Sequence, residues 1–210
     1  MYFPPTIPRV TGAVNLWKGL TTIGSQPDEG QGITIALVEV GLLDPAIIQA
    51  FSQETFGNNS LLNRVTEIGV GIPSRSAGIA DGYVWGWSVE TALDFGYVAA
   101  MAPQAHIDIV GIPDPFFSSF GTVFPFIGQY LTTGNPCNIP SGNVVYGPIQ
   151  DACSVTITSN SYGSGKTYTA HFGSPMYLTV FDEELSALSL QGVTNFFASG
   201  DSGGYFINLS

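Results

Sequence analysis

Charged residues are scarce in this sequence, and basic residues are the scarcest. Charged residues make up 10% of the chain, and five Lys and Arg against sixteen Asp and Glu leave a net charge of −11 at pH 7. A nucleic-acid partner is disfavoured, because it requires a basic surface. So few cations also leave little positive self-repulsion once acid has neutralised the carboxylates. The composition fits either a protein that works in acid or an ordinary acidic extracellular protein.

Long apolar runs are also lacking. No uninterrupted apolar stretch is long enough to span a membrane, and the opening MYFPPTIPRV lacks the basic region and apolar run of a signal peptide. Hydrophobic residues nevertheless make up 44% of the 210 residues, which is enough for one substantial domain with its own core. If the protein is exported, we expect that a leader has already been removed.

Only two cysteines are present, Cys137 and Cys153. The segment between them, NIPSGNVVYGPIQDA, is rich in turn-forming residues. A disulfide between the two would close a loop of about 15 residues, stabilise the fold by about 3 kcal/mol and indicate export. Two free thiols are the alternative. We favour the disulfide and a secreted, acidic location, with which the Asn-x-Ser triplets at Asn58 and Asn208 agree weakly.

Strand-like and helix-like segments alternate after a Pro- and Gly-punctuated lead-in over residues 1–30. We expect strands over 32–40, 63–71, 105–112, 154–163 and 193–199, and helices over 44–56, 88–102, 118–132 and 174–192. Asp44 and Ser88 are the expected helix N-caps. The pattern predicts, over residues 31–210, an α/β domain with a mostly parallel sheet flanked by helices, in which functional groups gather beyond the carboxyl ends of the strands.

Two carboxylates, Glu90 and Asp94, share one face of an expected helix because they are four residues apart. On an arbitrary helix such a pair is usually a solvated acidic face. Here aromatic and aliphatic residues such as Trp85, Trp87 and Phe95 surround it. Two carboxyl groups in apolar surroundings cannot both ionise cheaply, so one would hold its proton and hydrogen-bond to the other. That arrangement suits acid-base chemistry at low pH.

The string Gly-Asp-Ser-Gly-Gly at residues 200–204 matches the one that carries the nucleophile of chymotrypsin-like peptidases. That assignment for Ser202 fails, because His171 lies too close in sequence for a triad built between two β-barrels, and because the chain alternates strands with helices. The simplest structural interpretation is a strand-to-loop turn in which Asp201 caps backbone amides. Its place directly after a buried strand leaves a functional role for Asp201 open.

Several segments together resemble one family. VETALDFGYVAAMAPQAHIDIV (89–110), SVTITSNSYG (154–163) and DEELSALSLQGVTNFFASGDSGG (182–204) resemble, in order, the catalytic helix, a core strand and the Ser-Gly-Asp turn of the sedolisins, the serine-carboxyl peptidases. GITIALVEVG (32–41) is similar to their first core strand. The resemblance covers most of residues 30–205. It implies a protein that has a subtilisin-like fold and cleaves other proteins in acid.

The resemblance also implies a role for each acid. Glu90 would be the general base that activates a serine, and Asp94 would orient Glu90 and share its proton. Asp201 would be a protonated carboxylic acid that donates a hydrogen bond to the developing oxyanion. Ser202 would be a bystander. Glu39, at the end of the first strand, would be either a partner of the carboxyl pair or an ordinary loop acid.

The sequence departs from the family in one major respect. Sedolisins carry their nucleophile in a Gly-Thr-Ser-x-x-x-Pro pattern downstream of the Ser-Gly-Asp turn, and this sequence contains no such pattern. The family's calcium site and propeptide also have no counterpart, so no cofactor or metal is expected in this chain. We expect the domain to be incomplete. It would be one chain of two, a truncated fragment, or a non-enzymatic descendant.

The sequence therefore predicts an acid-acting serine-carboxyl endopeptidase, inactive as an isolated chain because the nucleophile is missing. Its expected partners are a protein or peptide substrate and a complementary C-terminal chain or like subunits. The alternative is a non-catalytic secreted structural or binding subunit on a degenerate sedolisin scaffold.

Overall fold

A computed structural model describes residues 29–134, 137–161 and 175–198, with the backbone alone for 175–180. One mixed sheet of six strands, in the order β4-β2-β3-β1-β5-β6, forms its centre. The strands are β1 (Thr34–Val40), β2 (Val65–Gly69), β3 (His106–Ile112), β4 (Val144–Tyr146), β5 (Val155–Asn160) and β6 (Thr194–Phe197). All neighbouring pairs are parallel except β2 with β4. The expected α/β class with a mostly parallel sheet is confirmed.

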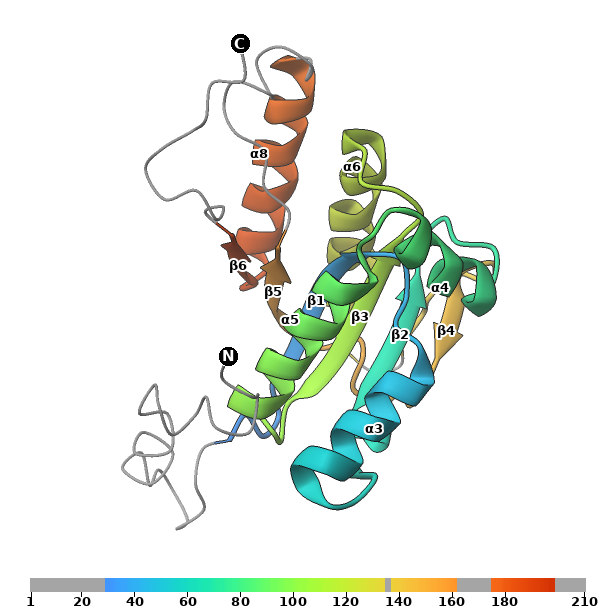
Figure 1. Cartoon of the computed structure of the whole chain (residues 1–210). Helices are drawn as coiled ribbons and strands as arrows, with labels where there is room; N and C mark the ends of the chain where they lie inside the picture. Colours follow the sequence, from blue (N-terminus) through green and yellow to red (C-terminus); the bar gives the residue numbers. More distant parts are fainter. Residues whose placement is uncertain (1–28, 135–136, 162–174, 199–210) are drawn as a thin grey trace, which may run out of the picture.

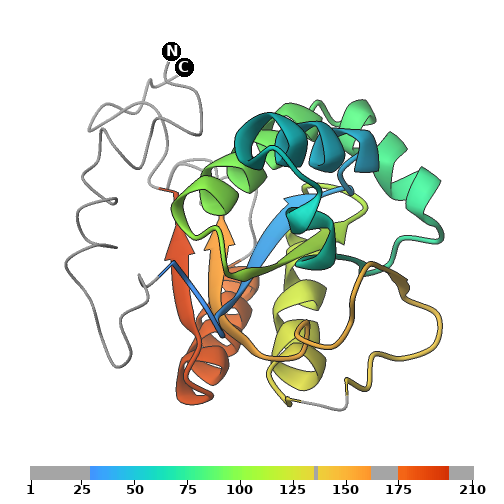
Figure 2. The ribbon, with the colours of Figure 1, turned by 90° about the horizontal axis from the view of Figure 1, so that it is seen from below.

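Helices cover both faces of the sheet (Figures 1 and 2). They are α3 (Pro45–Phe56), η2 (Ser60–Asn63), α4 (Arg75–Val84), α5 (Ser88–Met101), α6 (Phe117–Phe126), η3 (Ile127–Leu131) and α8 (Pro175–Leu190). In Figure 2 the sheet lies between α3, α4 and α5 on one side and α6 and α8 on the other. No helix within the described ranges is long and apolar enough to cross a membrane.

The alternation of side chains along the central strands divides the core into two clusters. One cluster contains Val38 and Val110 and packs against α6 and α8. The other contains Leu37 and Ile109 and packs against α3 and α5. All seven residues of β1 are buried, as expected of a central parallel strand. Glu39 follows Leu37 by two residues, so it lies on the face that α5 covers.

Of the two helix N-caps expected from the sequence, one is confirmed and one is wrong. The expected Asp44 cap is confirmed, because its carboxylate accepts a hydrogen bond from the Ala46 amide at the start of α3. The expected Ser88 cap is wrong: Ser88 is already helical, and Trp87 occupies the cap position without a capping side-chain bond. Residues 1–28 of the expected lead-in and the turn around Asp201 lie outside the described residues.

Two glycines let the end of β1 approach α4 closely. Gly41 has a φ of +84°, and a Cβ atom there would lie 2.4 Å from the amide nitrogen of Gly82. This contact brings Leu42 close enough to donate a backbone hydrogen bond to Gly78, and the Gly82 carbonyl accepts one from Trp87. The glycines thereby fix Trp87 beside the carboxyl end of β1.

Candidate functional site: a buried carboxyl pair

Glu39 lies fully buried near the carboxyl end of the central strand β1, with 0% of its surface exposed. It is therefore a core residue of the strand, and the alternative of an ordinary loop acid is wrong. A carboxylate is costly to bury unless hydrogen bonds or a proton compensate it. Its surroundings accordingly determine its charge.

Two donors converge on one oxygen of Glu39. Trp87 Nε1 and Thr91 Oγ1 each lie 3.2 Å from Glu39 Oε2. Trp87 directly precedes α5, and Thr91 faces the sheet from its first turns. Both side chains are held in place, because the Trp87 amide bonds to Gly82 and the Thr91 hydroxyl also lies 3.2 Å from the Trp87 carbonyl. The orientation of the Glu39 carboxyl group is thus set by α5 and by the residue before it.

Asp94 on α5 lies close enough to Glu39 for its negative charge to raise the pKa of Glu39. Glu39 Oε1 and Asp94 Oδ2 are both buried, and neither oxygen has a donor among the described residues. Two ionised carboxylates have no hydrogen to share, so a hydrogen bond between them requires a proton on one of them. Glu39 and Asp94 therefore form a buried carboxyl pair.

The pKa of Glu39 is raised well above its ordinary value of 4.5. Burial is the largest cause, followed by the negative charge of Asp94 and the hydrogen bond to it. Thr91 and Trp87 act in the opposite direction, because their hydrogen bonds favour the charged form. Since the raising effects win, Glu39 keeps its proton to a higher pH than an ordinary glutamate does.

Glu90 lies one helical turn before Asp94, on the same side of α5, and is half-buried. It is therefore the neighbour of Asp94 along that side of the helix. The structure brings Glu39, Asp94 and Glu90 to one place, at the carboxyl end of β1 and the amino-terminal half of α5. Asp201 lies outside the described residues.

The strand that leads toward the Gly-Asp-Ser turn is anchored to its neighbour. Asn160, the buried last residue of β5, donates a hydrogen bond from Nδ2 to the Phe196 carbonyl of β6 at 2.8 Å. The Ala198 amide in turn donates to the Asn160 carbonyl at 2.9 Å. Residue 198 is thus fixed at the carboxyl end of the sheet, three positions before Asp201.

Sequence reasoning did not identify Thr91 or the hydrogen-bonding role of Trp87. A signal for Thr91 was present: it is a hydroxyl residue at a core-facing position of an apolar helix, and a buried hydroxyl group requires a partner. Trp87 gave no such signal, because its indole also fits a purely apolar role. Within the described ranges no group of three or more His, Cys, Asp or Glu side chains is placed to hold a metal ion.

No protein-family model matches this chain, and no curated protein matches it significantly. The arrangement is thus characterised by its own geometry, as a buried carboxyl pair with a third acid beside it at the carboxyl edge of an α/β sheet.

Proposed function

We propose that this chain supplies the acid-base half of an acid-acting serine-carboxyl endopeptidase with a subtilisin-like arrangement of the sheet. The observation that carries the proposal is the contact between Glu39 and Asp94, one turn from Glu90, at the sheet edge where active sites of α/β proteins lie. An isolated surface acid pair would not need a third, fully buried carboxyl group with Trp87 and Thr91 as donors to one of its oxygens.

In this proposal Glu90 is the general base that takes the proton of a serine hydroxyl. Asp94 orients Glu90, and the proton between Asp94 and Glu39 limits how far negative charge accumulates at the site. Trp87 and Thr91 keep Glu39 Oε2 engaged, which turns its remaining oxygen toward Asp94. Such a group of carboxyl groups works as base and donor only over an acidic range of pH.

Asp201 is the proposed oxyanion donor. In the sequence it follows β6, a strand parallel to β5, and β5 is parallel to β1, so the carboxyl end of β6 lies at the same edge of the sheet as that of β1. As a protonated acid it would donate a hydrogen bond to the oxygen of the tetrahedral intermediate. In this proposal the acids do not supply the nucleophile, and a complementary chain segment provides the nucleophilic serine.

An exposed aromatic pair near this edge supports a peptide as the substrate. Trp85 and Phe116 are 42% and 56% exposed, and their rings meet edge to face at 5.4 Å. Trp85 Nε1 also donates to the Pro113 carbonyl at 3.1 Å. Large apolar side chains that are held in place yet exposed mark interaction surfaces. This pair would support the side chains of an extended peptide beside the acids.

The test is cleavage of a denatured protein substrate between pH 2.5 and 7 by this chain together with its complementary segment. The expected result is turnover below about pH 5 that falls at least about 100-fold in Glu90→Gln, as expected for loss of a general base. Glu183→Gln, on the exposed side of α8, removes one carboxylate elsewhere and serves as the matched control. Undiminished turnover in Glu90→Gln, or robust turnover by this chain alone, would overturn the proposal.

A further inference from the structure

A second polar site lies at the opposite, amino-terminal edge of the sheet. There a cavity of about 170 Å³ opens where β1, β2, β3 and β5 begin. Its polar lining consists of Thr34, Arg64, Gln104, His106, Asp151 and Ser154. None of these residues takes part in the carboxyl site. Because water occupies about 30 Å³ per molecule in the liquid, the cavity has room for a few waters or one small ion.

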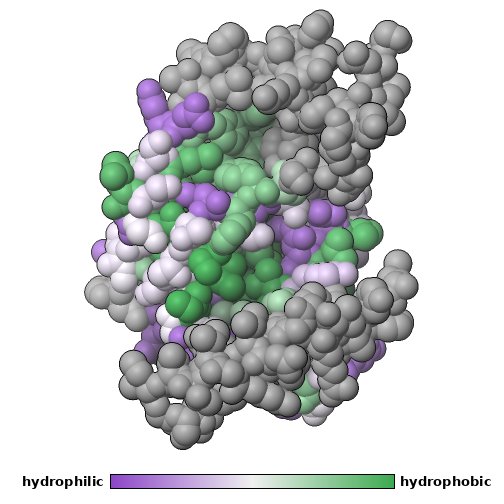
Figure 3. Space-filling model, turned by 90° about the vertical axis from the view of Figure 1, so that its left-hand side faces the viewer, coloured by the Kyte–Doolittle hydropathy of each residue, from purple (hydrophilic) through white to green (hydrophobic). Residues whose placement is uncertain are grey.

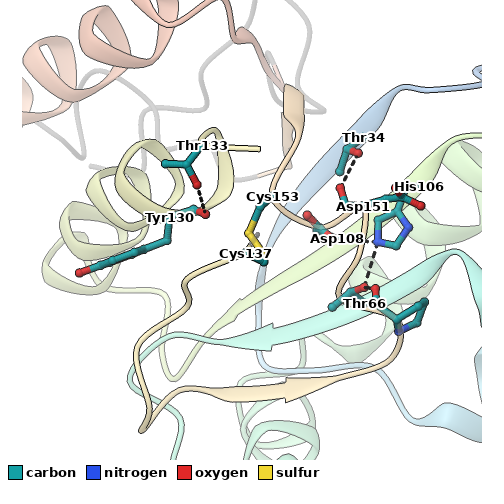
Figure 4. Close-up of a disulfide and its surroundings, with 10 residues drawn as sticks. Thr34, Thr66, His106, Asp108, Tyr130, Thr133, Cys137, Asp151 and Cys153 are labelled. Atoms are coloured by element: carbon teal, nitrogen blue, oxygen red, sulfur yellow. Dashed lines mark hydrogen bonds and ion pairs between the residues drawn. A yellow bond between two sulfur atoms is a disulfide. The ribbon is translucent and has the colours of Figure 1, made fainter. Parts of the chain in front are cut away.

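His106 lines this cavity and is only 5% exposed. Figure 4 shows its ring beside Thr66 and Asp108, where Nε2 lies 2.9 Å from Thr66 Oγ1 and 3.2 Å from Asp108 Oδ1. The Thr66 hydroxyl donates its own hydrogen to the Pro148 carbonyl at 2.5 Å. Thr66 therefore accepts from His106, and the hydrogen of the neutral imidazole sits on Nε2.

That assignment fixes the character of the other ring nitrogen. Nδ1 of His106 is buried and has no hydrogen-bond partner in the described part of the chain. In the neutral ring it carries no hydrogen, and it becomes a donor when the ring takes up a proton in acid. The arrangement is not a nucleophilic triad, because Thr66 and Asp108 both contact the same nitrogen.

Arg64 brings a donor to the same cavity. Its Nη1 donates to Gln104 Oε1 at 2.8 Å, while its Nε is buried and has no partner among the described residues. A buried donor without a partner costs about 1–3 kcal/mol, so Arg64 Nε, joined by Nδ1 once the His106 ring is protonated, favours an occupant that accepts hydrogen bonds. Ser154 adds a hydroxyl group to the same wall.

The charges around the cavity depend on pH in one consistent direction. Asp151 lines it, Glu29 acts on Arg64 through its charge, and Asp108 lies against His106. At neutral pH these carboxylates oppose the charge of Arg64. Lower pH favours the neutral form of a carboxyl group and the cationic form of an imidazole, so acidification makes the cavity more favourable for an anion.

We propose that this cavity binds a small oxyanion, of the size of sulfate or inorganic phosphate, in acid, with Arg64 and His106 as its charged donors. The site is independent of the proposed peptidase chemistry, since it lies at the other end of the strands. Planar guanidinium and protonated imidazole groups are well suited to oxyanions, because both donate through fixed N–H directions.

Sulfate is the appropriate probe, since its charge is the same at pH 4.5 and pH 7.5. Calorimetric titration of the whole chain, with chloride keeping the ionic strength constant, should show saturable binding at pH 4.5. Affinity should be at least about tenfold weaker at pH 7.5. Arg64→Met, which keeps the apolar stem of the side chain, should abolish the binding at pH 4.5.

Asp151→Asn provides the complementary test, because it removes an exposed negative charge from the cavity wall. It should strengthen sulfate binding near neutral pH several-fold, a gain that damage to the fold cannot produce. Glu183→Gln on α8 removes the same charge elsewhere and should change nothing. Absence of saturable binding at pH 4.5 in a folded chain, or unchanged binding in Arg64→Met, would overturn the proposal and leave water as the occupant.

Discussion

The carboxyl group of Glu39, in the central strand, lies near that of Asp94, on the helix that covers it, and burial together with the charge of Asp94 makes Glu39 hold its proton. Strand and helix contribute one acid each, 55 positions apart in a chain of 210 residues. The structure thereby couples the packing of α5 on β1 to the protonation of the site. Loss of that proton places two negative charges in the interface between helix and sheet.

Stability should be greatest in acid. Glu39, Glu67 and Asp108 are buried, and burial raises the pKa of each, that of Asp108 to about 6. A group whose pKa is raised on folding stabilises the fold fully below its unfolded pKa, and this contribution is lost as pH rises through its folded pKa. Asp108 alone should contribute about 3 kcal/mol at pH 3 relative to pH 7.

Denaturant unfolding at pH 3.5, 5, 6 and 7 measures this trend directly. Asp108→Asn should remove the part of the pH dependence that lies between the ordinary pKa of 3.8 and about 6, while Asp182→Asn, on the exposed side of α8, should leave it intact. A chain that is more stable at pH 7 than at pH 4 would be inconsistent with this interpretation.

Glu39→Gln should make the fold less sensitive to neutral pH. The amide oxygen can still accept from Trp87 and Thr91, and the amide nitrogen can donate to an ionised Asp94. We expect about 2 kcal/mol of added stability at pH 7, because the uncharged amide avoids a buried second charge, and little gain at pH 3. The free energy of unfolding of both proteins at the two pH values checks this. An equal effect at both pH values would point to packing alone.

Thr91→Val should change the pKa of Glu39. It removes one of the two donors to Oε2, whose hydrogen bonds favour the charged carboxylate, so the pKa of Glu39 should rise further. Stability should fall by about 1 kcal/mol. Thr122→Val, at an exposed position on α6, is the isosteric control. Carbonyl ¹³C shifts of Glu39 that titrate at the same pH in both proteins would argue against a role for Thr91.

The disulfide between Cys137 and Cys153 should stabilise the loop that covers Asp108 and His106 (Figure 4). That loop is tied to the sheet by Thr34 Oγ1, which donates to the Asp151 carbonyl at 2.9 Å. Replacing both cysteines with serine should cost about 3 kcal/mol and should speed amide exchange in residues 144–153 before any in β1. Uniform acceleration across the sheet would mean that the loop has no separate stability.

Apolar surface on α5 and β6 should drive association. Figure 3 shows hydrophobic surface gathered on the face that carries these elements. Val89 and Leu93 on α5 are 76% and 49% exposed, and Phe196 and Phe197 on β6 are 57% and 43% exposed. Patches of this kind mark contact sites. Sedimentation velocity should show mass rising with concentration, and Val89→Glu with Leu93→Lys should suppress it. A monomer at all concentrations would argue against such a contact.

The main strands and helices could be predicted from sequence, because each is a clear apolar run or amphipathic segment between turn residues. Helix α4 could not be predicted, since the segment Arg75–Val84 carries two glycines that its close packing on β1 requires. Strand β4 was missed because two half-buried residues and one exposed residue within a turn-rich segment give no periodic signal. The acid pair Glu90 and Asp94 was visible from spacing alone.

The place of Glu39 could only be suspected from sequence. A single acid in an apolar run fits a strand end or a loop equally well, and its contact with Asp94 is set by how α5 packs on β1. The charge pattern around His106 was equally hidden, because Arg64, His106 and Asp151 come together only when the strands align.

The most direct test of the carboxyl pair is a ¹³C NMR titration of the Glu39 side chain between pH 2 and 8. The account predicts that Glu39 keeps its proton well above pH 4.5 and that Asp94→Asn lowers its titration midpoint, since the charge of Asp94 is then gone. A midpoint at or below 4.5, unchanged in Asp94→Asn, would mean that the two carboxyl groups share no proton, and the proposed acid-base site would lose its basis.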